Sequence, residues 1–270
     1  MTPFLADLID LAAGVRRARI DENPDGVMFS SGENIGRRLY AEVYGAREAD
    51  WDATVAYISG LAPRLAEAHV FRFENIPYRP IEGEDGFSGP VADEEAVALF
   101  NAGRLRLPFP VCWFEYRSAT EGMLYGLLVE ERGSERWEVW AFDEDDTRKG
   151  NGRRVLGFCC ASVRLERIAD EKAAAEVERG DGLTGSFRDD VCSVVVDPLG
   201  HWEGPAWVFP RERLRYLFAL YLAGELAAPD KSIEVVAPSM IENMRRSKRG
   251  ATRLRPYSKV TLKGEGTAPS

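Results

Sequence analysis

The sequence has few of the residues on which metal and catalytic chemistry most often depends. Its 270 residues include only two histidines and four cysteines. His69 and His201 lie far apart, and no two cysteines form a C-x-x-C pair, so the chain lacks the close ligand pairs of a structural zinc site. We therefore predict no metal and no cofactor, assign no catalytic residue, and favour a non-enzymatic protein.

Long apolar runs are also absent. No run approaches the roughly 20 residues that a membrane-spanning helix needs. The first residues, Thr2 to Asp7, bring an acid early and no basic residue before the apolar positions, unlike a secretory signal. The four cysteines lie in apolar runs, which is typical of buried thiols in a reducing compartment. These features predict no membrane partner and a cytoplasmic location.

Acidic residues are scarce in one region only, the segment from Ile241 to Lys263. It carries eight basic residues against the single acid Glu242, a sum of +7, and since the whole chain sums to −9 the remainder sums to −16. Such segregation indicates a polyanionic partner for the basic part, with nucleic acid as the first hypothesis. The residues predicted to contact it are Arg245, Arg246, Lys248, Arg249, Arg253 and Lys259.

Other interpretations of this basic segment stay open. Positive side chains in the last turns of a helix complement its dipole, and the acidic remainder of the chain can pair with the others at the surface. The partner can also be an acidic protein. In a further alternative the acidic body binds or inhibits a host protein, and the basic edge serves only assembly.

An enzymatic alternative depends on His201, which lies between Asp197 and Glu203. Two carboxylates near an imidazole can orient a general base, as a hydrolase or transferase requires. We favour the simpler interpretation, a loop histidine hydrogen-bonded to its neighbours.

The acidic run Asp143 to Asp146 lacks the ligand spacing of an EF-hand, and we interpret it as a solvated turn. The tryptophans of the middle region can stack on bases, but large aromatics in a sheet are more often core.

Hydrophobic periodicity predicts helices near both ends of the chain and strands in its middle. We expect Pro63 to split the second helical region into two short helices. Ser239 and Glu242 form a capping-box pattern at the start of the basic helix, which should end at Gly250. The helices are expected at 2–19, 48–69, 93–101, 166–178, 211–226 and from 239, and the strands at 111–116, 123–131, 136–142, 155–165, 190–196, 233–236 and 257–263.

The order of these elements predicts an α+β fold. We expect a single domain over residues 1–263, in which the middle of the chain forms a largely antiparallel sheet and helices from both ends pack on it. The basic helix-strand unit is displayed at one edge. Residues 75–90, rich in glycine and proline, are a possible flexible boundary, and residues 264–270 are expected to form a disordered tail.

Two stretches carry a resemblance to a known group of proteins. The first is Leu107-Pro108-Phe109-Pro110 followed by Trp113-Phe114-Glu115. The chain resembles proteins encoded by bacteriophages and prophages that have no assigned biochemical role; Arg253 departs from their pattern, where proline is usual. The resemblance implies a phage-type accessory protein in a bacterial host cell and implies no chemistry. Its second stretch is the C-terminal series Asn243, Arg246, Gly250, Leu254, Tyr257, Val260 and Leu262.

Overall fold

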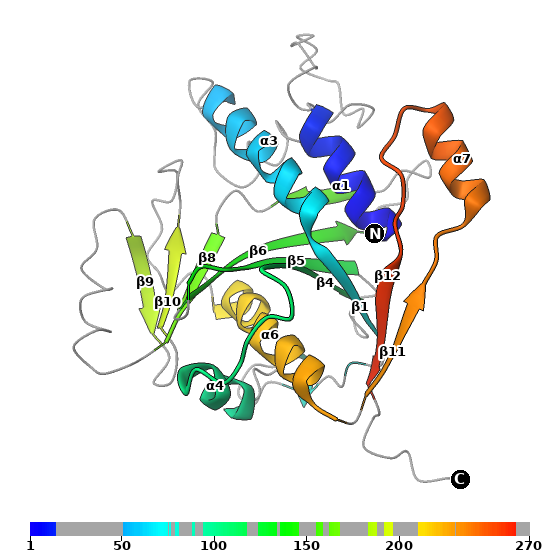
Figure 1. Cartoon of the computed structure of the whole chain (residues 1–270). Coiled ribbons are helices and arrows are strands. Elements are labelled where there is room, and N and C mark those ends of the chain that lie inside the picture. Colours follow the sequence, from blue (N-terminus) through cyan, green and yellow to red (C-terminus); the bar gives the residue numbers. More distant parts are fainter. Residues whose placement is uncertain are drawn as a thin grey trace.

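The computed structural model is shown in Figure 1. It describes residues 1–14, 51–74, 76, 79–80, 88–89, 94–117, 124–133, 136–145, 155–158, 162–167, 183–187, 192–196, 210–229 and 231–262.

A ten-stranded sheet forms the centre of the described structure. Its order is β11-β12-β1-β4-β5-β6-β8-β10-β9, with β7 paired to β6. Strand β1 is parallel to both β12 and β4, and the other pairs are antiparallel. The strands are β1 His69–Glu74, β4 Val111–Arg117, β5 Leu124–Glu131, β6 Arg136–Asp145, β7 Val155–Phe158, β8 Ser162–Glu166, β9 Leu183–Phe187, β10 Cys192–Val196, β11 Lys231–Val236 and β12 Tyr257–Leu262, while β2 Arg79–Pro80 and β3 Ser88–Gly89 pair separately.

Helices cover both faces of this sheet. Helices α1 (Pro3–Gly14) and α3 (Trp51–Glu67) pack on one face, and α4 (Glu94–Asn101) and α6 (Pro210–Ala227) pack on the other. The fifth described helix, α7 (Met240–Lys248), lies beyond the end of β11 (Figure 1). The fold is therefore α+β with a mixed, mostly antiparallel sheet, as the sequence predicts.

Each sheet face has its own hydrophobic cluster because successive side chains of a strand point to opposite sides. On β4, Trp113 joins the cluster under α1 and α3, whereas Phe114 joins the cluster under α4 and α6. Trp113, Trp137 and Trp140 are fully buried, which confirms the core interpretation for these three tryptophans. Trp202 and Trp207 lie outside the described residues.

The prediction that Pro63 divides the second helical region is wrong. Helix α3 runs unbroken from Trp51 to Glu67 with Pro63 inside it. Leu61 and Leu65 flank the proline and are buried in the cluster with α1, while Pro63 itself is exposed. Burial of these neighbours holds the helix together despite the backbone hydrogen bond that a proline removes.

The strand expected over residues 155–165 is described in two parts, β7 and β8, and residues 159–161 between them lie outside the described residues. Strand β6 is long enough to pair with both: Phe142 to Asp145 face β7, and Arg136 to Val139 face β8. The same pairing corrects the interpretation of Asp143 to Asp146 as a turn. Residues 143–145 belong to β6: β7 pairs with all three, and β5 pairs with Asp143 and Glu144.

Strand β9 is a further difference, since no strand is expected at Leu183–Phe187. Gly185 interrupts its apolar pattern, and glycine weakens the strand signal of a short segment. Strand β1 is unexpected as well, because the sequence assigns no strand between the helix expected at 48–69 and the loop at 75–90; the short β2 and β3 are also unexpected. The remaining strands agree with expectation to within a few residues. The helix expected over residues 166–178 does not begin at Glu166, which is the last residue of β8, and residues 168–178 lie outside the described residues. The extension of the first helix past Gly14 and the tail at 264–270 also lie outside them.

Candidate interaction surface

The basic C-terminal unit consists of β11, α7 and β12. Ser239 caps α7, because its Oγ accepts a hydrogen bond from the amide of Glu242 at 3.4 Å, as the capping pattern predicts. The helix ends at Lys248, slightly before the expected Gly250. Gly250 has a φ of 70°, a left-handed conformation that glycine adopts without strain and that lets the chain reverse toward β12.

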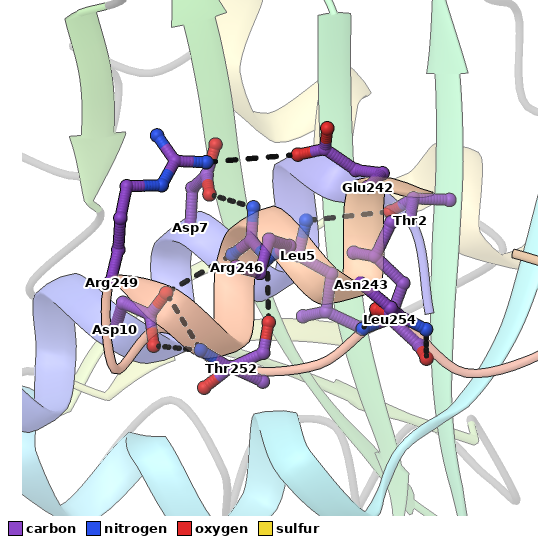
Figure 2. Close-up of polar contacts among 10 residues, drawn as sticks. All are labelled: Thr2, Leu5, Asp7, Asp10, Glu242, Asn243, Arg246, Arg249, Thr252 and Leu254. Carbon is purple, nitrogen blue, oxygen red and sulfur yellow. Dashed lines mark hydrogen bonds and ion pairs between the residues drawn. The ribbon is translucent and has the colours of Figure 1, made fainter. Parts of the chain in front are cut away.

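Arg246 fastens α7 to α1 (Figure 2). Its Nη1 lies 2.7 Å from Oδ1 of Asp7, and its Nη2 lies 3.0 Å from Oδ2 of Asp10. Its Nε donates to the carbonyl of Thr252 at 2.6 Å, and the Thr252 amide donates back to Asp10 at 2.8 Å. The Arg246 side chain is only 5% exposed. Its charge therefore serves the fold, and we leave Arg246 out of any surface for phosphates.

Two other polar side chains of α7, Asn243 and Glu242, also contact residues of the C-terminal unit. Asn243 donates to the carbonyl of Leu254 at 3.0 Å and accepts from the Leu254 amide at 2.7 Å. Oε1 of Glu242 lies 3.8 Å from Nη2 of Arg249. Glu242 thus forms an ion pair along the helix rather than the reciprocal half of a capping box. Figure 2 shows Asn243 and Arg246 directed toward the neighbouring chain segments. Asn243 and Arg246 therefore lie on the inner side of α7, whereas Arg245 and Lys248 are exposed.

The apolar side of α7 faces outward. Met240 is 78% exposed, Ile241 64% and Met244 56%. Residues at these spacings share one side of a helix, and a residue two positions past Met244, such as Arg246, lies on nearly the opposite side. This orientation is the reverse of an ordinary surface helix, which buries its apolar stripe and exposes its polar one.

Strand β11 adds further exposed apolar residues at the edge of the sheet. It pairs with β12 on one side and is the end of the strand order among the residues that the structure describes. Ile233 is 49% exposed and Val235 71%. Ile233 lies opposite Val260, which belongs to the hydrophobic cluster under α4 and α6. Ile233 and Val235 are two residues apart, so both side chains point to that same face of the sheet. We call these side chains of β11 and α7 the outer surface: Ile233, Val235, Met240, Ile241 and Met244.

The remaining predicted nucleic-acid contacts divide into paired and exposed groups. Lys259 lies 2.9 Å from Glu74, whose hydrogen bond raises the pKa of Lys259. Arg249 faces Glu242 but its side chain is 68% exposed, and Arg253 donates from Nε to Ser247 at 2.8 Å. Arg245 and Lys248 are exposed, and neither has a side-chain partner within the described part of the chain. The structure thus brings four of the six to the exterior near α7: Arg245, Lys248, Arg249 and Arg253.

Sequence reasoning missed the apolar part of this surface. The alternation of apolar and polar residues in α7 shows that the helix has two faces, but it does not say which of them points inward. Convention assigns the apolar face to the core. The contact of Arg246 with Asp7 and Asp10 fixes the opposite orientation, and the local sequence of the helix carries no signal of that distant contact.

The structure does not test the enzymatic alternative, because its three residues lie outside the described ranges: Asp197, His201 and Glu203. His69 stacks on Phe109 with ring centroids 3.7 Å apart. Burial, and secondarily the nearby terminal amine, lowers the pKa of His69. No group of three metal-ligating side chains occurs within the described ranges.

Cys112 is a buried free thiol in β4. It donates to the carbonyl of Phe109 at 3.3 Å, and desolvation by burial raises its pKa to about 12. A thiol with so high a pKa stays protonated at physiological pH and is a poor nucleophile. Cys112 therefore behaves as a structural residue, as we interpreted the cysteines from the sequence.

Comparison with known proteins adds no assignment. No protein-family model, curated protein or solved structure matches the chain. The resemblance to phage proteins therefore stays a prediction. Within the described residues, no helix is long and apolar enough to cross a membrane.

Proposed function

We propose that this protein is a non-enzymatic interaction module that binds another protein through the outer surface of β11 and α7. The observation that carries the proposal is the inverted helix. Met240, Ile241 and Met244 expose more than half of their surface, while Asn243 and Arg246 of the same helix make internal contacts. Exposed apolar patches of this kind mark interaction sites.

The composition of the surface supports a protein partner. Methionine and arginine are both enriched at protein interfaces, and methionine adapts its shape to different partners. A surface for phosphates alone has no need of apolar side chains at its centre. This interpretation develops the alternative in which the basic edge serves assembly. An acidic body that binds or inhibits a host factor stays a separate prediction.

The test is a selection of displayed random peptides on the immobilised full chain. A variant carrying Met240→Ser, Ile241→Ser and Met244→Ser is selected in parallel. We expect peptides to be enriched on the original chain and not on the variant, with equal thermal unfolding temperatures for both, because all three side chains are exposed. Equal enrichment on both chains, or none on either, would contradict the proposal.

Nucleic acid is the second candidate, and the exposed cations near α7 favour it. Arg245, Lys248, Arg249 and Arg253 can reach phosphates, whereas Arg246 is occupied by Asp7 and Asp10. If all four contact phosphates, the log-log salt slope of duplex binding is about −3.6, from about −0.9 per phosphate. Fluorescence anisotropy with a labelled duplex measures this slope. Affinity that does not change with salt would exclude this candidate.

A further inference from the structure

We infer that the partner is an acidic, extended protein segment that adds to β11 as a further strand and continues onto α7. The inference rests on the proposed function and names the chemistry of the partner and its mode of docking. Three properties of the outer surface carry it: the open edge of β11, the direction of β11 toward α7, and the charge beside the apolar side chains.

The open edge offers backbone hydrogen bonds. Strand β11 is six residues long and its middle residues are exposed on both faces, with β12 on one side only among the described strands. An edge strand of this length presents unpaired amide and carbonyl groups that another strand can use. Peptides commonly bind this way, with affinity from the backbone and specificity from alternate side chains.

The direction of β11 leads toward α7. The strand runs from Lys231 to Val236, and α7 begins four residues later at Met240 (Figure 1). A segment paired with β11 can cover Ile233 and Val235 with every second side chain. Where it passes the end of the strand, it can continue toward α7, which follows β11 in the chain.

Charge selects among possible occupants. Arg245 and Lys248 lie beside the apolar face of α7 without an acidic partner in the described structure. A second copy of the chain would bring two such groups of cations together, and like charges oppose that contact. The charges of Lys231 and Glu234 cancel, so β11 itself has no net charge. An acidic segment is therefore the occupant that the charges favour.

The experiment uses the full chain and two labelled peptides, one alternating valine with glutamate and the other valine with lysine. We expect the glutamate peptide to bind and the lysine peptide not to bind. The double variant Arg245→Glu with Lys248→Glu should weaken binding of the glutamate peptide by at least about tenfold and gain binding of the lysine peptide. The matched control is Arg104→Glu, an exposed position outside the C-terminal unit, which should leave both affinities unchanged.

Failure of this inference can be told apart from failure of the proposed function. Affinities that do not respond to the charge reversal would overturn the acidic partner. Hydrogen exchange tests the strand: amides of β11 should exchange more slowly in the complex, and unchanged exchange there would overturn strand addition. In either case, peptides selected through the α7 methionines would still support the interaction module. Preferential binding to anionic vesicles instead of the glutamate peptide would overturn the inference in favour of a lipid surface.

Discussion

At the scale of single residues, Arg246 shows how a charge that suggests binding can be used for folding. Its guanidinium joins α7 to α1 through Asp7 and Asp10 and also closes the turn at Thr252. The desolvation of a buried cation offsets much of the free energy that its ion pairs contribute. Removing the cation is nevertheless destabilising, because two carboxylates lose their counterion. The whole unit therefore depends on this residue more than on its exposed neighbours.

We expect Arg246→Ala to lower the free energy of unfolding by about 3 kcal/mol, near the low end for a broken buried ion pair. The low end applies because Asp7 and Asp10 are each about a third exposed and regain water. Arg245→Ala is the matched control, with an expected change within about 0.5 kcal/mol. Chemical denaturation measures both, and equal effects of the two substitutions would contradict this role.

His69 makes stability depend on pH. Burial lowers its pKa in the folded state below the ordinary value of 6.5, so the folded protein favours the neutral ring stacked on Phe109. The contribution of a group with a lowered folded pKa is fully present above the unfolded pKa and is lost as the pH falls through the folded pKa. Acidification below about pH 6.5 should therefore destabilise the chain partly through this residue.

The comparison for this prediction is His69→Phe, which keeps a ring on Phe109 but cannot titrate. Its free energy of unfolding should fall less between neutral and mildly acidic pH than that of the original chain. Parallel pH curves for the two proteins would show that His69 does not contribute.

At the scale of elements, the central strands pack closely enough that one glycine is required. In β5, a Cβ on Gly126 would lie 2.1 Å from Cζ2 of Trp113, which is fully buried in the cluster below α1 and α3. The large ring has no room to withdraw because Phe4 and Phe142 contact it. Gly126 therefore makes the space that the tryptophan fills.

Gly126→Ala should cost about 3 kcal/mol, at the upper end for added volume in a packed core. Gly60→Ala in α3 is the matched control, because a Cβ there meets nothing within 4 Å. Within a helix that substitution should stabilise by about 0.5–1 kcal/mol. Thermal unfolding of both variants measures the difference, and similar behaviour of the two would contradict the packing argument.

Most elements follow from local pattern, and the exceptions have identifiable causes. The strands around Trp113, Leu127 and Val139 and the helix containing Phe218 agree with their periodicity, because that periodicity reflects which side is buried. Pro63 was misjudged because its neighbours' burial outweighs a local preference. The outward face of α7 depends on a contact with Asp7, more than two hundred residues away in sequence.

At the scale of the whole molecule, charge is less segregated than the sequence suggests. The excess of +7 in the C-terminal segment is reduced where Asp7, Asp10 and Glu74 approach Arg246 and Lys259. The cations left outside accompany the exposed apolar side chains of α7, the helix that follows the edge strand β11. This combination shifts the proposal from a phosphate-binding surface to one for another protein. The single domain over residues 1–263 stays a prediction.

The most direct measurement of the central claim is calorimetric titration of the valine-glutamate peptide into the original chain and into the variant Met240→Ser, Ile241→Ser, Met244→Ser. We predict a loss of at least about tenfold in affinity at an unchanged unfolding temperature, since these side chains contact a partner and not the core. Equal affinity, or a variant that unfolds at a much lower temperature, would show that the outward face of α7 is not a docking surface.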